Sequence, residues 1–143
     1  ETGDVPSGIA MDRASNRIFS GCSKMSVVTD ATTGKVVAEI PNGIGVDALG
    51  WDQRQKLMYI PAGRDGNVAV VHEDSPDKYS VVATVATQAG AKTITVDDAT
   101  HIAYAFTPEY GPAPAPAPGA TPPANRRGPR GPMIGTWFIS ITH

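Results

Sequence analysis

The chain has 143 residues, of which 41% are hydrophobic and 18% charged, and its formal net charge is −2. This balance fits a globular domain with one sizeable core, and it excludes the general positive field that attracts nucleic acid or an anionic membrane. No window approaches the roughly 18 consecutive apolar residues that a membrane span requires. Cys22 is the only cysteine, which excludes an intrachain disulfide, and we interpret it as a buried small residue.

The first stretch of the chain predicts a four-stranded unit that spans residues 4–44. A short apolar run ends at Asp12, a tight turn follows, and Phe19 lies on the second strand. Third and fourth strands are predicted on either side of a turn that contains Gly34. Residues 1–3 resemble what remains after a secretion leader is removed, and they are left out of the fold prediction.

Residues 45–90 repeat the same order of features. The apolar run closes at Asp52, Tyr59 follows on the second strand, a third strand begins after Gly66, and a fourth is predicted over residues 79–86. A short carboxylate at such a turn accepts hydrogen bonds from nearby backbone N–H groups. We therefore interpret the recurring Asp as a structural turn residue rather than a catalytic one.

Residues 91–143 repeat the pattern with only three strands. Asp97 closes the first run, Tyr104 lies on the second strand, and the third strand follows a Pro-rich insertion at 108–132. Its alternating Ala-Pro run favours an extended surface loop, either a tolerated insertion or a docking peptide with a basic hook. The last strand has an open edge, on which we predict the residues that contact a partner. They are Trp137, Phe138, Ile139 and Ile141.

The three units share one register. An aromatic residue follows each Asp by seven positions, and the three Asp residues lie 40 and 45 positions apart. Four short strands in about 40–45 residues is the period of a propeller blade, whereas a β-sandwich does not predict a shared register. The predicted fold class is therefore all-β, a partial β-propeller with two four-stranded blades and a three-stranded third blade.

The first unit also carries a family resemblance. From Pro6 to Ile40 it reads Pro-x-Gly-Ile-Ala-x-Asp, then Asn-Arg-Ile-Phe, then Val-Val-Thr-Asp-x-x-Thr-Gly-Lys-Val-Val-Ala-x-Ile. This pattern resembles the blade consensus of YncE-like proteins, seven-bladed β-propellers that are commonly bacterial and exported. The resemblance covers most of residues 6–107, resumes at 135–142, and implies a periplasmic or extracellular protein. It matches blade-building positions, so it implies a fold and no particular ligand.

Three blades do not close a propeller, whose usual minimum is about four. The outer faces of the first and third blades are therefore expected to be apolar and uncovered. We expect them to be covered by another copy of the chain, which would bring the total to about six blades, or by the remaining blades of a larger propeller. No nucleic-acid partner is predicted.

Few residues in the sequence suggest a catalytic, cofactor-binding or metal-binding site. His72, His101 and His143 lack the spacing of a metal site, and the sequence contains no nucleophile elbow, phosphate-binding loop or dinucleotide fingerprint. We therefore predict no catalytic, cofactor-binding or metal-binding residue, and no cofactor. A bound ligand is expected at the loops that enter each first strand, where Asp47 and Lys92 are the charged residues.

Two functions remain open from the sequence. In the first, the chain is a non-enzymatic module that acts as a protein-interaction or assembly scaffold. In the second, it is the C-terminal part of a propeller enzyme that resembles lactonases or quinoprotein dehydrogenases, with the catalytic groups on other blades. The sequence favours the first, because its three units hold no paired carboxylates and no histidine cluster.

Overall fold

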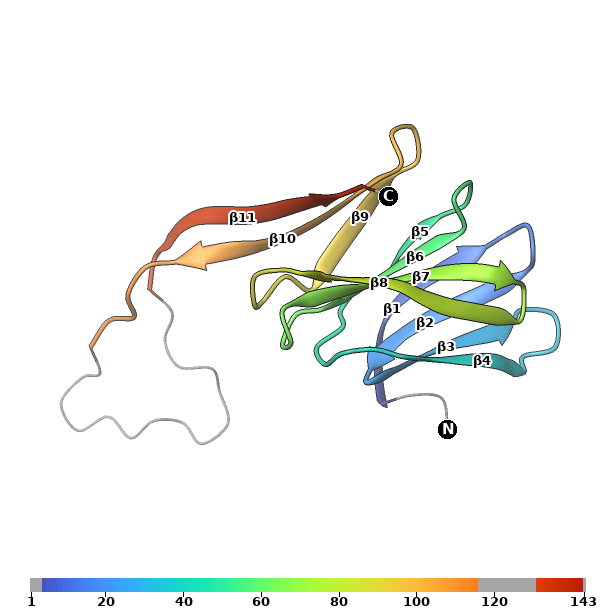
Figure 1. Ribbon diagram of the computed structural model, residues 1–143. Coiled ribbons are helices and arrows are strands. Elements are labelled where there is room, and N and C mark those ends of the chain that lie inside the picture. The colour runs from blue at the N-terminus through green and yellow to red at the C-terminus, as the bar shows by residue number, and fades with distance from the viewer. Residues whose placement is uncertain (1–3, 116–130, 143) are drawn as a thin grey trace.

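The computed structural model describes residues 4–115 and 131–142. Within these ranges the chain is built from β-strands, and no helix there is long and apolar enough to cross a membrane. The strands form three antiparallel sheets of four, four and three strands, and within each sheet consecutive strands are neighbours (Figure 1). The predicted all-β class and the division into blades of four, four and three strands are confirmed.

The first two sheets are complete blades. The first contains β1 (Asp4–Asp12), β2 (Arg17–Ser23), β3 (Met25–Asp30) and β4 (Val36–Pro41). The second contains β5 (Gly50–Asp52), β6 (Leu57–Ala62), β7 (Asn67–Ser75) and β8 (Lys78–Ala86). Their registers match, because Ala10 pairs with Phe19 in the first blade and Gly50 pairs with Tyr59 in the second.

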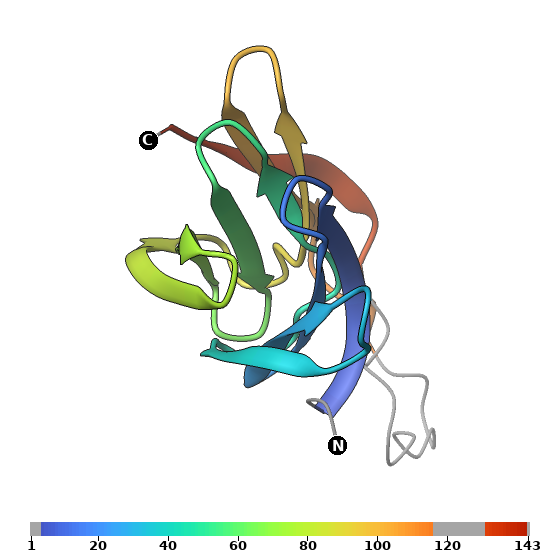
Figure 2. The same ribbon diagram turned by 90° about the vertical axis from the view of Figure 1, so that its right-hand side faces the viewer.

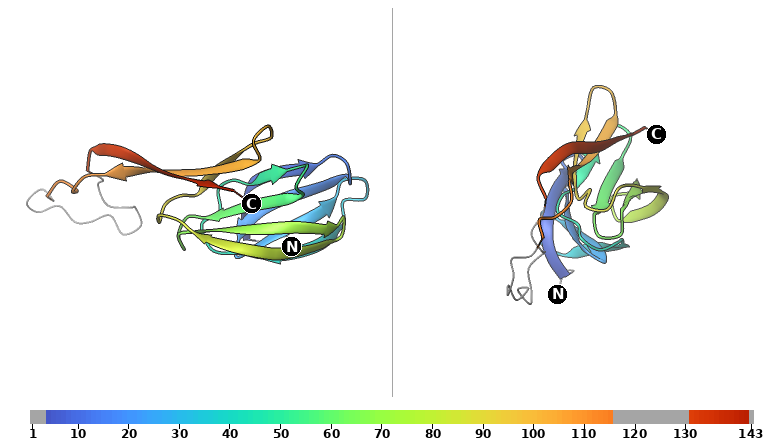
Figure 3. Two further views of the ribbon diagram at one scale, coloured as in Figure 1. Left: turned by 45° about the horizontal axis from the view of Figure 1, so that its top comes forward. Right: turned by 90° about the vertical axis from the view of Figure 1, so that its left-hand side faces the viewer.

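The third sheet consists of β9 (Thr93–Asp97), β10 (Ile102–Tyr110) and β11 (Met133–Ile141). The hairpin of β10 and β11 projects beyond the other two sheets (Figures 1 and 3). Residues 108–110, expected within the Pro-rich insertion, instead end β10, because their backbone pairs with residues 133–136. The middle of the insertion, residues 116–130, lies outside the described residues.

The same turn joins the first and second strands of each blade. The carboxylate of its Asp accepts a hydrogen bond from the backbone N–H two residues later, and the residue four positions after the Asp has a left-handed backbone. The hydrogen-bond distances are 2.8 Å at Asp12, 2.9 Å at Asp52 and 2.9 Å at Asp97. The φ angles are 59° at Asn16, 54° at Lys56 and 60° at His101. The predicted structural role of the three Asp residues is confirmed, since short polar side chains stabilise such turns.

The blades stack face to face, with the second blade between the other two (Figure 2). Phe19 of the first blade is fully buried in the cluster that joins it to the second blade. Its ring lies 4.8 Å from the ring of Trp51 and 5.9 Å from that of Tyr79, centroid to centroid, both in the second blade. Such tilted and edge-on aromatic contacts add to the stability that burial provides.

Replacing Phe19 by alanine tests this interface. We expect Phe19→Ala to lower the free energy of unfolding by about 3–5 kcal/mol, because it removes a fully buried ring and leaves a cavity between two blades. Urea denaturation measures the change. Val82→Ala on the exposed surface of β8 is the control and should stay within about 0.5 kcal/mol of the wild type. Equal effects of the two substitutions would contradict the interface.

Candidate functional site

Neighbouring blades pack through one repeated interface. In the second and third blades, the residues three positions and one position before the turn Asp point toward the preceding blade. Leu49 and Trp51 of the second blade pack against the first core cluster, and Ile94 and Val96 of the third blade pack against the second cluster. We call this side of a blade its front face, and the side that packs on the following blade its rear face.

The front face of the first blade is uncovered in the described part of the chain. Ile9 and Met11 occupy the positions of Leu49 and Trp51, yet Ile9 is 74% exposed and Met11 is 39% exposed. The same positions are covered by a preceding blade in both other blades. This surface therefore carries the same kind of apolar side chains as the two covered front faces, but it is exposed.

The rear face of the third blade is uncovered as well. Phe19 and Tyr59 are fully buried on the rear faces of the first two blades, whereas the equivalent Tyr104 is only half-buried. Beside Tyr104, the cross-strand pair of Phe106 and Phe138 is 43% and 69% exposed. The rear face of the third blade therefore exposes aromatic side chains where the other two rear faces are covered by a following blade.

The four predicted interaction residues lie on two different sides of β11. Phe138 is on the rear face. Ile139 and Ile141 instead pack in the core between the second and third blades, and strand alternation places the half-buried Trp137 on that same side. The edge of β11 carries no further strand within the described residues. Phe106 was not predicted, although the alternation of large and small side chains over residues 102–107 indicates that it shares a face with Tyr104.

A polar contact accompanies the apolar packing at each internal interface. His101 Nδ1 of the third blade lies 2.7 Å from Asp52 Oδ2 of the second. Burial opposes ionisation of Asp52, but the hydrogen bonds from the Gln55 N–H and from His101 hold its pKa below the ordinary value. At the first interface, Gln53 hydrogen-bonds the carboxylate of Asp12.

Asp97 occupies the same position in the third blade. Its carboxylate accepts hydrogen bonds from the Ala99 N–H at 2.9 Å and the Thr100 hydroxyl at 2.8 Å, both within its own turn. Unlike Asp12 and Asp52, which are 2% and 1% exposed, Asp97 is only half-buried. It therefore presents a carboxylate at the rim of the uncovered rear face.

A second carboxyl group lies beside Asp12 inside the first interface. Glu73 is 1% exposed, its Oε1 lies 3.7 Å from Lys56 Nζ, and its Oε2 has no hydrogen-bond partner among the described residues. Burial raises the pKa of Glu73, and the neighbouring charge of Asp12 raises it further. Asp12 keeps a lowered pKa despite burial, because Ser15, Gln53 and the Ala14 N–H hydrogen-bond its carboxylate.

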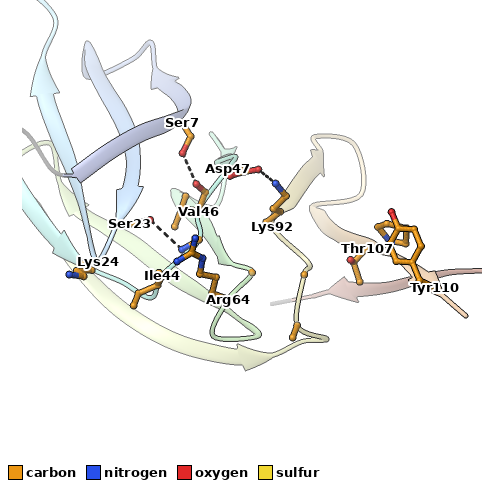
Figure 4. Close-up of a pocket in the computed structure, with 15 residues that line it drawn as sticks. Ser7, Ser23, Lys24, Ile44, Val46, Asp47, Arg64, Lys92, Thr107 and Tyr110 are labelled. Carbon is orange, nitrogen blue, oxygen red and sulfur yellow. Dashed lines mark hydrogen bonds and ion pairs between the residues drawn. The ribbon is translucent and has the colours of Figure 1, made fainter. Parts of the chain in front are cut away.

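A pocket of about 1010 Å³ lies where loops of all three blades meet (Figure 4). The predicted loops before the first strands of the second and third blades line it through residues 44–47 and through Ala89, Gly90 and Lys92, while Ser7, predicted in a loop, lines it from β1. The pocket also takes in the end of each second strand or the loop that follows it, which were not predicted from the sequence. Those residues are Ser23, Lys24, Gly63, Arg64, Thr107, Pro108 and Tyr110. Strands alternate in direction, so these loops share one end of the blades.

The pocket is lined by cations and hydroxyl groups. Lys92 Nζ contacts Asp47 Oδ2, while Lys24 and Arg64 make no ion pair with any described residue. The described residues contain no group of three or more His, Cys, Asp or Glu side chains placed to hold a metal ion. The pocket mixes these polar groups with apolar side chains such as Ile44 and Val46, whereas the exposed side chains of Ile9, Met11, Phe106 and Phe138 lie on the two uncovered blade faces.

Solved structures with a similar fold are propeller proteins. The chain is similar to part of a mitotic checkpoint complex, with a TM-score of 0.61 and 19% identity over 68% of this chain and 32% of that one. It is also similar to the β-propeller domain of Cps50 (Swd1) from Myceliophteria thermophila, with a TM-score of 0.59 and 14% identity over 73% and 32%. A third similar structure is hydrazine synthase from Kuenenia stuttgartiensis, with a TM-score of 0.61 and 17% identity over 73% and 30%.

The fold is a partial β-propeller. The chain spans only about a third of the length of these similar structures, and at such identities the similarity shows the fold alone. No family model and no curated protein matches the sequence.

The carboxyl pair of Glu73 and Asp12 predicts a pH dependence of stability. A raised pKa in the folded state means that Glu73 adds stability below its unfolded pKa, and that this stability is lost as the pH rises through the folded value. We expect the melting temperature of the wild type to fall between about pH 5 and about pH 8 by a few degrees more than that of Glu73→Gln, the size that about 1 kcal/mol produces. Scanning calorimetry at both pH values measures it.

The opposite result has a clear meaning. If the wild type becomes more stable relative to Glu73→Gln between about pH 5 and about pH 8, the charged form of Glu73 is stabilising through Lys56, and the raised pKa is contradicted. Lys56→Gln is the companion variant. It removes the cation on the exposed side of the pair, and it should steepen the loss of stability with rising pH.

Proposed function

We propose that this chain is a non-enzymatic β-propeller module that acts as a protein-interaction and assembly scaffold. Its interaction surfaces are the front face of the first blade and the rear face of the third. Further propeller blades cover these faces, supplied by another copy of the chain or by a larger propeller. The assembled ring then presents the loop-end pocket on one side.

The observation that carries this proposal is the exposure of residues whose repeat equivalents are buried. Ile9 is 74% exposed where Leu49 and Ile94 pack against a preceding blade. Phe106 is 43% exposed where Gly21 and Pro61 are buried. A blade interface buries apolar area from both partners, so covering these positions stabilises the assembly.

Narrower proposals follow from the sequence resemblance. The pattern of residues 6–40 supports membership of the YncE-like bacterial propellers, and with it a periplasmic or extracellular location. The similarity of the fold to propellers from a mitotic checkpoint complex and from Cps50 is consistent with a role in assembly. These relationships rest on blade-building positions and concern no particular ligand.

Hydroxyl-radical footprinting of the protein in intact cells that produce it, with their periplasm and surface included, tests the scaffold function. Met133 and Phe138 are 66% and 69% exposed, and both side chains react readily with hydroxyl radicals. Met133 pairs with Tyr110, which strand alternation places on the rear side of β10 together with Phe106. We expect both to be oxidised several-fold more slowly in cells than in the free chain, because a partner blade covers the rear face. Oxidation is read by peptide mass spectrometry.

Two internal references make the footprint interpretable. Met58, which is 1% exposed in the first interface, gives the rate for a buried methionine. Val82 on β8, which is 47% exposed and lies on neither uncovered face, gives the rate for an exposed side chain. If Met133 and Phe138 are as reactive in cells as in the free chain, nothing covers the rear face and the scaffold function fails.

A further inference from the structure

We propose that a second copy of this chain covers both uncovered faces at once. The rear face of the third blade of each copy packs on the front face of the first blade of the other, which produces a two-fold ring of about six blades. This inference rests on the proposed function and names the partner. The two interfaces that the chain already contains show which residues such a contact brings together.

The apolar residues of the proposed interface correspond to those of the two internal interfaces. In both internal interfaces, an aromatic residue seven positions after the Asp meets the apolar residues just before the next Asp, as when Phe19 contacts Trp51. At the proposed interface, Tyr104 of one copy takes the place of Phe19, and Met11 of the other takes the place of Trp51. Phe106 and Phe138 of the rear face then cover Ile9.

The polar groups of the proposed interface also correspond to those of the internal interfaces. Gln53, one position after its Asp, hydrogen-bonds Asp12 across the first interface, and His101, four positions after its Asp, contacts Asp52 across the second. The first blade offers donors at the same two positions, Arg13 and Asn16. Both would face Asp97 of the other copy, which lies at the rim of the uncovered rear face.

The charges favour this pairing. Arg13 is exposed and makes no ion pair with any described residue. The amide of Asn16 donates to the Thr32 hydroxyl at 2.6 Å and keeps a second N–H free to donate. A guanidinium and an amide opposite the carboxylate of Asp97 therefore continue the polar contact found at the internal interfaces.

Ring closure follows from the form of the interface. A front face and a rear face are different surfaces, so their contact is head to tail and closes only when the rotations sum to a full turn. Propellers typically close with between about four and eight blades, and two copies of three blades fall within this range. A closed pair leaves neither face of either copy exposed.

The first experiment measures the mass of the purified chain by sedimentation. We expect a species of twice the 14.9 kDa of one chain.

Phe138→Glu and Ile9→Glu should each raise the dissociation constant about tenfold or more, because each buries a charge on one side of the interface. Both side chains are largely exposed within one chain, so neither substitution disturbs its core. Val82→Glu on β8 is the matched control and should leave the mass unchanged.

A mixing experiment separates head-to-tail contact from other dimers. Phe138→Glu damages only the rear face and Ile9→Glu only the front face, so a mixed pair retains one undamaged interface. We expect the mixture to form dimers at concentrations where each variant alone is a monomer. Recovery on mixing also shows that both variants are folded.

A charge reversal tests the polar contact separately. Arg13→Glu should weaken the dimer about tenfold, because it places a carboxylate opposite Asp97, and the loss should shrink in high salt. Arg54→Glu is the matched control. Arg54 is exposed on the corresponding turn of the second blade, away from both uncovered faces, so its reversal should have no effect.

Four results would overturn the proposal. A wild-type chain that stays a monomer at all concentrations removes the second copy as partner, and cellular protection of Met133 and Phe138 would then assign the faces to other blades. A dimer broken by Phe138→Glu but not by Ile9→Glu is back to back. A mass that grows with concentration beyond two copies means that the ring does not close. Mixed variants that remain monomers exclude head-to-tail contact.

Discussion

Burial between neighbouring blades is the constraint on which the rest of this structure depends. A four-stranded sheet has two faces, and in this chain both become apolar because the strands alternate between a front and a rear set of side chains. Phe19 is fully buried only because the second blade covers it, and Tyr59 is fully buried only because the third blade covers it. The core of the molecule is thus a series of contacts between repeats rather than the interior of any one sheet.

The repeat could be predicted from the sequence because the residues that define it have strong preferences for turns and strands. The turn Asp residues and the aromatic residues seven positions later set the register of three sheets, and the structure places them as predicted. The ends of the last hairpin could not be predicted in the same way. Pro108 argues against a strand, but it lies in β10 because pairing with Thr136 of β11 extends the ladder past it.

The candidate site was only partly predictable for a related reason. The open edge of β11 follows from the strand count, but the side that each residue faces depends on pairing with β10. Phe138 faces outward and Ile141 inward because their partners are Phe106 and Ala103. The contact between His101 and Asp52 joins residues 49 positions apart in the chain, and no local sequence pattern predicts it.

The second blade differs from the other two because both of its faces are covered. Every residue of β6 is buried, because a neighbour covers each face of its sheet, while β11 alternates between exposed and half-buried positions along most of its length. In a stack of repeats, an element covered on both faces opens last and an end element opens first. Unfolding should therefore begin in the terminal blades. A substitution in β6 disturbs two interfaces, whereas damage to the projecting hairpin is confined to one.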